Sequence, residues 1–181
     1  MFSRLIFILL FSFLSAFSSF SQDLTQNKKQ SKITFKVKNL GFNVNGSFKE
    51  FVVKSKFNFK DLKESFLNVE ISAKSIFTDS ESRDNHLLKS DFFDVKKHPT
   101  ITFKSSKIEK SKQNKFILTG LLTIKGIEKK FKVPIEVSTK DKDVKILANF
   151  SLNRRHFGVG GSSFVLSKKV KIKMIIVGNI A

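Results

Sequence analysis

The segment from Arg83 to His86 carries the side chains best suited to chemistry in this chain. Arg83, Asp84 and His86 lie within four residues, and a guanidinium, a carboxylate and an imidazole together could form a catalytic cluster. Catalysis would also need a nucleophile or a metal ion supplied by another segment. The chain has no cysteine, and its other two histidines, His98 and His156, lie in separate segments. A three-histidine zinc site is therefore conceivable but unsupported, and we predict no catalytic residue, no metal site and no cofactor.

A structural role explains the same segment more simply. Residues 82–94 are expected to form a short helical segment, for which Asp79 or Ser80 can act as the N-cap. Arg83 and Asp84 would then make hydrogen bonds at the helix ends or to neighbouring elements. The segment also carries an apolar stripe that could close one end of a larger structure, and its members are Leu87, Leu88, Phe92 and Phe93.

A third interpretation gives basic side chains contact with the polar head group of a ligand. Arginine suits this role because its planar guanidinium matches the geometry of a phosphate. The candidates are Arg83, His86 and Arg154. The run Gly158-Val159-Gly160-Gly161 superficially resembles a phosphate-binding loop, but it lacks the Lys-Ser/Thr pair and the following helix. We expect a mobile loop there.

β-Strands are expected to position these side chains. The dominant hydrophobic period is two, as in Phe131-Val133-Ile135-Val137 and Val170-Ile172-Met174-Ile176. Such runs predict half-buried strands, and the chain contains eight or nine of them. The apolar phase slips by one residue near Lys49-Glu50, which indicates a bulge or a bend. Turn residues connect the runs, and Asn45-Gly46 is one such predicted turn.

The first twenty-one residues have the pattern of a secretory signal peptide. Arg4 supplies a positive start, Leu5 to Leu14 form an apolar core, and small residues precede Gln22. We expect cleavage after Ser21, a flexible N-terminal arm at 22–32 and a single domain at 33–181. No later segment has the roughly 20 apolar residues of a transmembrane helix. The mature protein is therefore expected in the periplasm or outside the cell.

The chain is strongly basic, with 34 Lys and Arg against 15 Asp and Glu and a net charge of +19. Such a charge attracts anionic lipid surfaces, polyanions or acidic ligands. Lysines are scattered along strand faces, as in Lys54, Lys56 and Lys60, so a solvated exterior is the simpler explanation. Peripheral contact with an anionic membrane stays open, and we predict no nucleic-acid partner. The sequence leaves the oligomeric state undetermined, with a homodimer as one option.

Short antiparallel strands in one domain leave two main architectures. A sandwich fills its interior with side chains from two sheets. A closed barrel of about eight strands can fill its lumen or enclose one small ligand. Periodicity does not separate the two. The 22 phenylalanines, many of them on strands, favour a barrel that holds a ligand.

Four ordered blocks of sequence resemble the YceI-like family. The blocks are Phe35 to Gly41 with Gly46-Ser47-Phe48, Arg83 to Asp94 with His98 to Ser105, Gly120 to Ile127, and Leu152 to Val159. The resemblance covers roughly Ile33 to the C-terminus. It implies a lipocalin-like, extended antiparallel β-barrel, exported in bacteria, whose lumen holds an isoprenoid chain such as a polyprenyl phosphate or an isoprenoid quinone. Asn39 departs from the family pattern, in which a histidine is common.

A lumen of this kind needs apolar side chains rather than catalytic ones. Each buried CH₂ group of a polyprenyl tail contributes about 0.8 kcal/mol, so a tube lined with Phe, Leu, Val and Ile suffices. The alternative is that these side chains simply pack a filled core. The candidates for the lumen are Phe42, Val44, Phe57, Phe59, Val69, Ile71, Phe92, Phe93, Phe103, Leu118, Leu122 and Phe150.

We therefore expect a binding protein, not an enzyme, that carries an amphiphilic isoprenoid lipid. The alternative function is a basic surface-association protein that binds anionic lipid head groups or polyanions electrostatically. Rising salt would abolish binding of the second kind and would barely change binding in a lumen.

The exported protein is predicted to begin at Gln22. The full chain should be expressed in a bacterial host, and the protein collected from the periplasm or the medium should be weighed intact by mass spectrometry. We expect the mass of residues 22–181. The mass of the complete 181-residue chain in that fraction would contradict the predicted cleavage.

Overall fold

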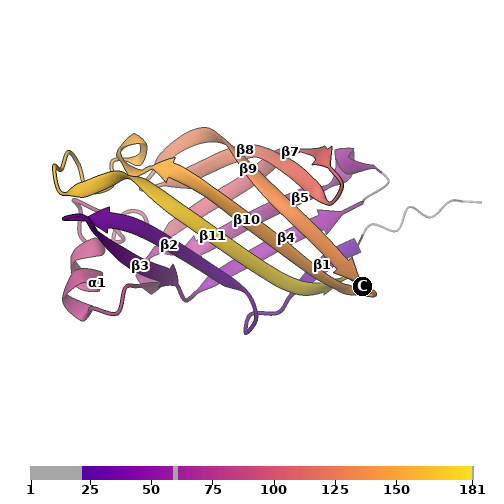
Figure 1. Cartoon of the computed structure of the whole chain (residues 1–181), viewed down its shortest axis with the longest axis horizontal. Coiled ribbons are helices and arrows are strands. Elements are labelled where there is room, and N and C mark those ends of the chain that lie inside the picture. Colours follow the sequence, from indigo (N-terminus) through magenta and orange to yellow (C-terminus); the bar gives the residue numbers. More distant parts are fainter. Residues whose placement is uncertain (1–21, 59–60, 181) are drawn as a thin grey trace, which may run out of the picture.

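The computed structural model describes residues 22–58 and 61–180, so the predicted signal peptide at 1–21 lies outside the described residues. The described chain forms one antiparallel sheet of eleven strands (Figure 1). In chain order they are β1 (Gln22–Gln26), β2 (Lys32–Asn39), β3 (Phe42–Phe48), β4 (Phe51–Phe57), β5 (Phe66–Ser72), β6 (Ile76–Phe77), β7 (Thr100–Lys112), β8 (Lys115–Ile124), β9 (Ile127–Lys140), β10 (Asp143–Asn153) and β11 (Leu166–Ile180). The helices are η1 (Leu62–Glu64), η2 (Ala73–Ser75), α1 (Glu81–Leu87) and η3 (Arg154–Phe157).

Eight of these strands close into a barrel. Their order around the ring is β1-β4-β5-β7-β8-β9-β10-β11, and β1 pairs with both β4 and β11. Asp23 pairs with Lys56 on one side, and Leu24 pairs with Ile180 on the other. Beyond the residues that pair with β1, the strand β11 pairs with β2, and the sheet continues from β2 to β3 and then to β6. The predicted antiparallel, lipocalin-like barrel is therefore confirmed, and the sandwich alternative is wrong.

The strand β1 occupies part of the region predicted as a flexible N-terminal arm. Leu24 is buried in the core, and the side chain of Gln26 accepts a hydrogen bond from the backbone N–H of Val53 (2.9 Å). The N–H of Asn27 then donates to the carbonyl of Val177 (2.8 Å). The arm is ordered because it fills the gap between β4 and β11, whose edges would otherwise have unpaired backbone groups.

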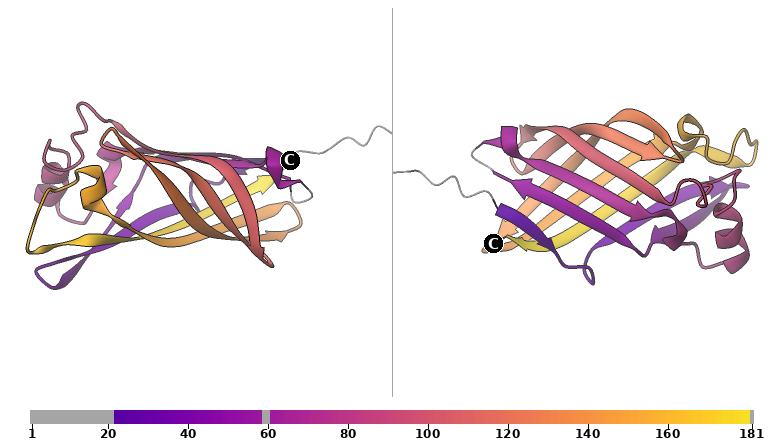
Figure 2. Two further views of the ribbon diagram at one scale, coloured as in Figure 1. Left: turned by 90° about the horizontal axis from the view of Figure 1, so that it is seen from above. Right: turned by 180° about the vertical axis from the view of Figure 1, so that it is seen from behind.

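Side chains alternate between the interior and the exterior of the barrel, as the period of two predicts. On β10, for example, Val144, Ile146 and Ala148 are buried, whereas Lys145 and Asn149 are exposed. The strands run at an angle to the long axis of the barrel (Figure 2), as closure of a sheet requires.

The chain bends where the sequence predicted a slip in phase. The strand β3 ends at Phe48 and β4 begins at Phe51, with Lys49 and Glu50 between them. The break transfers the chain from pairing with β2 and β6 to pairing with β5. Ser75 fixes the bend, because its carbonyl and its Oγ accept hydrogen bonds from the backbone N–H groups of Lys49 (3.0 Å) and Glu50 (3.1 Å).

The predicted turn at Asn45-Gly46 is wrong, because both residues lie within β3. Leu40 and Gly41 form the turn between β2 and β3 instead, at φ angles of 50° and 83°. Gly46 faces the ring of Phe35, and a Cβ atom at position 46 would lie 2.2 Å from Cζ of that ring. This glycine leaves space for an aromatic side chain inside the barrel.

The barrel is packed solid at the end where the β7–β8 and β9–β10 hairpins turn. The rings of Phe57 and Phe116 meet there in an edge-to-face contact, with centroids 6.4 Å apart. Other buried side chains fill the same end, among them Leu24, Ile108, Val137 and Val144. We call this the closed end.

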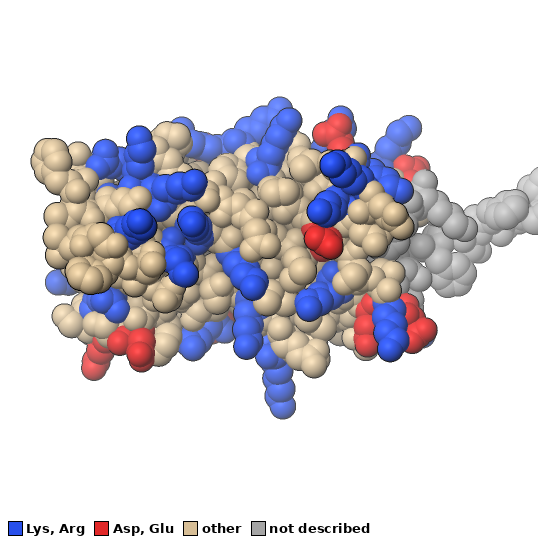
Figure 3. Space-filling model, viewed as in Figure 1, with Lys and Arg blue, Asp and Glu red and all other residues tan. Residues whose placement is uncertain are grey.

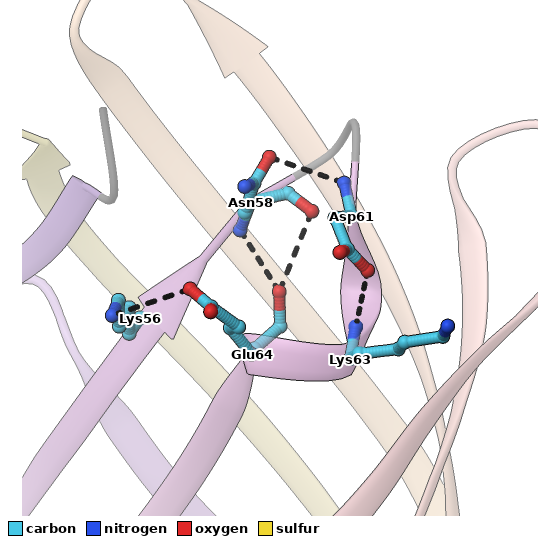
Figure 4. Close-up of polar contacts among 6 residues, drawn as sticks. Lys56, Asn58, Asp61, Lys63 and Glu64 are labelled. Carbon is cyan, nitrogen blue, oxygen red and sulfur yellow. Dashed lines mark hydrogen bonds and ion pairs between the residues drawn. The ribbon is translucent and has the colours of Figure 1, made fainter. Parts of the chain in front are cut away.

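Local hydrogen bonds shape the connection between β4 and β5, which also lies at the closed end (Figure 4). Ser65 Oγ accepts a hydrogen bond from the N–H of Asn58 (2.9 Å). Asn58 Oδ1 accepts from the N–H of Asp61 (3.2 Å), and Asp61 Oδ1 accepts from the N–H of Lys63 (3.0 Å), which caps η1. These contacts are all local, because each joins residues at most seven positions apart in the chain.

The helical segment is shorter than the predicted 82–94. The helix α1 ends at Leu87, and a series of turns follows over 88–98. Asp94 adopts a φ of 48°, and the N–H of Phe93 donates back to the carbonyl of Leu87 (3.1 Å). The turns bring Phe92 and Phe93 back against the core. The helix lies at the end of the barrel opposite the C-terminus, which we call the mouth (Figures 1 and 2).

No helix among the described residues is long and apolar enough to cross a bilayer.

Gly178 on β11 tests the closure of the barrel by β1, because a Cβ atom there would lie 2.4 Å from the carbonyl oxygen of Thr25. Gly178→Ala should force β1 away from β11 and lower the free energy of unfolding by about 1–3 kcal/mol, as overpacking does. Lys171→Ala on the outer face of β11 is the control and should change stability by less than about 0.5 kcal/mol. Urea unfolding followed by circular dichroism measures both. Unchanged stability of Gly178→Ala would contradict the closure.

Candidate ligand-binding cavity

The barrel is hollow between the mouth and the packed side chains of the closed end. The cavity has a volume of about 410 Å³, which lies in the usual range of small-molecule sites. Inward-facing side chains of β2, β3, β5 and β7 to β11 form its walls, and nearly all of them are apolar. An eight-stranded barrel has just enough interior to be filled by side chains or to hold one small ligand. Here side chains fill the closed end, and the cavity occupies the interior toward the mouth.

Nine of the twelve predicted lumen residues line this cavity. They come from five strands and from the turns after α1, and they are Val44, Val69, Ile71, Phe92, Phe93, Phe103, Leu118, Leu122 and Phe150. The strand period placed their side chains on the interior face. Their contact with a ligand stays a prediction.

The other three candidates do not line the cavity. Phe42 is 78% exposed, because the β2–β3 hairpin projects past the wall of the barrel at the mouth (Figure 2). Phe57 is buried, but it packs against Phe116 in the closed end. Phe59 lies outside the described residues. The assignment of Phe42 and Phe57 to the lumen is corrected accordingly.

Polar lining groups gather at the mouth. Seven polar residues line the cavity, and with the exception of Thr102 they belong to the β2–β3 hairpin, the segment around α1 or the chain between β10 and β11. These six residues are Asn39, Thr78, Arg83, His86, Arg154 and Ser163. The cavity is therefore apolar along its depth and polar at its opening, which is the polarity of an amphiphilic molecule.

Arg83 and Asp84 both bind Thr78, a buried residue between β6 and α1. Arg83 donates from Nε to Thr78 Oγ1 (2.7 Å) and from Nη2 to the carbonyl of Thr78 (2.7 Å). Asp84 accepts from Thr78 Oγ1 (2.5 Å) and from the N–H of Thr78 (3.2 Å). The two charged side chains thus fix the start of α1 to the barrel, in agreement with the structural interpretation of the segment.

His86 has a different partner from Arg83 and Asp84. Its Nε2 lies 2.9 Å from Oδ2 of Asp91, and its ring contacts that of Phe92 edge to face at 5.0 Å. The hydrogen bond with His86 lowers the pKa of the Asp91 carboxyl below its ordinary value. The structure therefore divides Arg83, Asp84 and His86 between two separate contacts, one with Thr78 and one with Asp91, and each contact positions the chain around α1.

Arg154, the first residue of η3, is buried, and its guanidinium donates to four backbone carbonyl groups of the described chain. The residue is 4% exposed. Nε donates to Ser167 (3.0 Å), Nη2 donates to Leu166 (2.8 Å), and Nη1 donates to Val159 (2.6 Å) and Gly161 (2.9 Å). Four of its five N–H donors are used, and the residue holds the loop between η3 and β11 in place.

The charge of Arg154 has no carboxylate partner among the ion pairs of the described residues. Burial lowers the pKa of its guanidinium, and the neighbouring charge of Arg155 acts in the same direction. Arginine nevertheless stays protonated near neutral pH. A positive charge balanced only by carbonyl dipoles thus borders the mouth of an apolar cavity.

The glycine-rich loop at 158–161 was predicted to be mobile, but it is tied to its surroundings. Besides the contacts with Arg154, the N–H of Gly160 donates to the carbonyl of Asp91 (2.8 Å). A Cβ atom at Gly160 would lie 2.7 Å from Cε1 of Phe92. The glycine permits this approach at its φ of 67°, so the loop and the turns after α1 form one wall of the mouth.

No group of three or more His, Cys, Asp or Glu that could hold a metal ion occurs in the described parts of the chain.

Comparison with known sequences decides the family. The model of the YceI-like domain matches residues 24–177. The chain belongs to the YceI-like family. A UPF0312 protein of Pseudomonas savastanoi pv. phaseolicola is 29% identical over 136 residues, which are 71% of each chain. One from Pectobacterium carotovorum subsp. carotovorum is 33% identical over 112 residues, 61% of this chain and 58% of the relative.

Solved structures share the fold of this YceI-like protein. Burkholderia cenocepacia BcnA is 26% identical with a TM-score of 0.82, over 86% of this chain and all of BcnA. The Campylobacter jejuni YceI protein is 30% identical with a TM-score of 0.71, over 76% of this chain and 85% of that one. A polyisoprenoid binding domain from Saccharophagus degradans has a TM-score of 0.66 over 88% of this chain and 98% of the domain. At 10% identity its likeness concerns the fold alone.

Sequence reasoning missed two kinds of residue in this YceI-like protein. Thr78, which Arg83 and Asp84 bind, has no motif of its own, and only its place between a strand and a helix start could have suggested it. Phe35, Ile172 and Met174 also line the cavity. Their strands were recognised, and the period of two would have placed all three on the inner face.

Arg154 should be essential to the stability of the mouth, because Arg154→Met leaves four carbonyl groups without their donors. We expect the free energy of unfolding to fall by about 2–4 kcal/mol. Arg155→Met is the control, since the side chain of Arg155 is exposed and donates to one carbonyl group, that of Ser163 (2.7 Å), among the described residues. Urea unfolding of both variants measures the difference. Equal stability of the two variants would show that Arg154 does not hold the loop.

Proposed function

We propose that this protein is an exported carrier that binds one amphiphilic isoprenoid lipid in its barrel. The observation that carries the proposal is the polarity of the cavity, which is lined by apolar side chains along its depth and has most of its polar lining groups at the mouth. A tail of linked isoprene units would lie along the strands and bury its CH₂ and CH₃ groups. At about 0.8 kcal/mol for each buried CH₂, no covalent chemistry is needed for retention.

Arg154 supports a ligand whose head group is anionic or carries a carbonyl oxygen. It keeps one N–H donor after its four backbone contacts, and its charge has no carboxylate partner in the described structure. A phosphate or a quinone oxygen near the mouth would accept a hydrogen bond in a region of low dielectric, where such contacts are strong. Arg83 and His86 border the same opening.

Family membership agrees with this proposal. A domain from Saccharophagus degradans that shares the fold is described as polyisoprenoid binding. Export is supported by the apolar leader of the sequence. A binding role rather than an enzymatic one is supported by the use of Arg83, Asp84 and His86 to position the chain around α1.

The competing function is electrostatic association of the basic surface with polyanions or lipid head groups. A hollow, apolar interior would contribute nothing to electrostatic binding at the surface. The competing function also makes a different prediction for salt, because screening weakens contacts between exposed charges and leaves an apolar lumen almost unaffected.

A phenylalanine placed in the lumen tests the proposal. Ala148 on β10 is buried and lines the cavity, so Ala148→Phe fills space that a lipid tail would occupy. Asn149→Phe is the control, because it adds the same ring at the next residue, whose side chain lies on the outer face of the barrel. We expect the amount of co-purified lipid per chain to fall more than about tenfold in Ala148→Phe, a loss of about 1.4 kcal/mol or more, and to stay unchanged in Asn149→Phe.

The measurement is organic extraction followed by mass spectrometry of equal amounts of folded protein. Circular dichroism confirms that both variants are folded. Equal lipid content in the two variants, or an unmodified protein that carries none, would contradict binding in the lumen.

A further inference from the structure

The mouth of the barrel carries a cluster of exposed apolar side chains at the tips of two neighbouring segments, the β2–β3 hairpin and the loop before β11. Leu40 is 67% exposed, Phe42 is 78% exposed, Val165 is 49% exposed and Phe164 is fully exposed. The N–H of Leu40 donates to the carbonyl of Val165 (2.9 Å), so the two tips are joined. We call these four residues the apolar rim.

Leu40 is an unfavourable residue for its position in the turn. Leu40 and Gly41 both have positive φ angles, 50° and 83°, as in the two-residue hairpin turn that favours Asn-Gly. A leucine there combines an unfavourable backbone conformation with an apolar side chain in water. The turn accounts for the positive φ angle, but no packing contact in the described structure accounts for an apolar side chain that is this exposed. Contact with an apolar surface outside the protein would account for it.

The elements beside the apolar rim carry no carboxylates. Residues 33–48 and 144–180, which include β3, β11 and most of β2 and β10, contain nine Lys and Arg and no Asp or Glu. Lys168 and Lys169 follow the apolar rim directly in the chain, and Lys36 pairs with Lys171 across β2 and β11. Figure 3 shows basic side chains over β2, β10 and β11.

The opposite side of the mouth is acidic. From Asp79 to Asp94 the chain around α1 carries five Asp and Glu against one Arg and one Lys, and carboxylates appear at that corner in Figure 3. The mouth thus has an apolar and basic edge along the β2–β3 hairpin and an acidic edge along α1. Such an arrangement gives a negatively charged surface one preferred orientation of approach.

We propose that the apolar rim and the lysines beside it form a docking surface for an anionic lipid bilayer. The four apolar side chains would enter the boundary between head groups and acyl chains, while the lysines meet the lipid phosphates. Docking in this orientation sets the mouth of the cavity against the membrane and turns the acidic edge away from it. Exchange of the ligand through this contact rests on the proposed function, but docking itself does not.

A single tryptophan can report the docking, because the chain has no Trp and no Tyr. Phe164→Trp places the probe on the apolar rim. Leu121→Trp places it on the outer wall of β8, at a residue that is 41% exposed. Vesicles of phosphatidylcholine with phosphatidylglycerol, added to the exported protein, should shift the emission of Phe164→Trp to shorter wavelength and leave Leu121→Trp unchanged. Vesicles of phosphatidylcholine alone should bind at least about tenfold more weakly.

Two further sets of variants separate docking from general effects on folding or charge. Leu40→Asn should raise the midpoint of urea unfolding, because Asn suits the positive φ angle, and should weaken vesicle binding. Lys168→Glu with Lys169→Glu should also weaken binding. Lys140→Glu with Lys142→Glu makes the same change in net charge at the closed end and should leave binding unchanged.

Three results would overturn the proposal. The first is an equal shift from the two tryptophans, and the second is an equal effect of the two lysine pairs. The third is a shift of Phe164→Trp that grows with protein concentration without vesicles while light scattering shows a doubled mass, since a second copy of the chain would then cover the apolar rim. If the protein carries lipid but vesicles do not shift the emission of Phe164→Trp, docking is wrong and the proposed function stands. If vesicles shift that emission but the protein never carries lipid, the proposed function is wrong and docking stands.

Discussion

Pairing of β1 with both β4 and β11 is the constraint on which the rest of the structure depends. A sheet of this length has two edges unless its ends meet, and five residues of β1 bring them together. The closure also places Leu24 in the packed end of the barrel, which contains Phe57 and Phe116. Because that end is filled, the remaining interior is a blind cavity whose polar groups lie at the mouth. Under the proposed function, an amphiphilic ligand would therefore enter with its apolar part first.

Arg154 shows how the mouth is built without a conventional salt bridge. A buried charge is costly unless dipoles or an opposite charge compensate it, and here four carbonyl groups do so, two in the loop before β11 and two at the start of β11. The same contacts join this loop to the turns after α1, since Gly160 lies against Asp91 and Phe92. One residue thus organises the wall of the mouth and places a positive charge where a head group would lie.

Local pattern predicted the strands, the bend at Lys49-Glu50 and the inward faces, because the period of two is a property of each strand by itself. The pattern does not show how far along the barrel a side chain lies. Phe42 and Phe57 share the inward face of their strands with lumen residues, but Phe42 lies beyond the mouth and Phe57 lies in the closed end. The strand β1 was missed because Gln22-Asp23-Leu24-Thr25-Gln26 has one apolar residue, and its order comes from distant partners. The role of Arg154 was only partly predictable, since its partners are backbone carbonyls that no side-chain motif reveals.

A crystal structure of the protein, purified without added ligand, tests the central claim most directly. The account predicts continuous elongated density inside the barrel, with its narrow end toward Phe57 and Phe116 and its bulkier end beside Arg154 at the mouth. The opposite orientation would contradict the account, and so would a cavity closed by rearranged side chains.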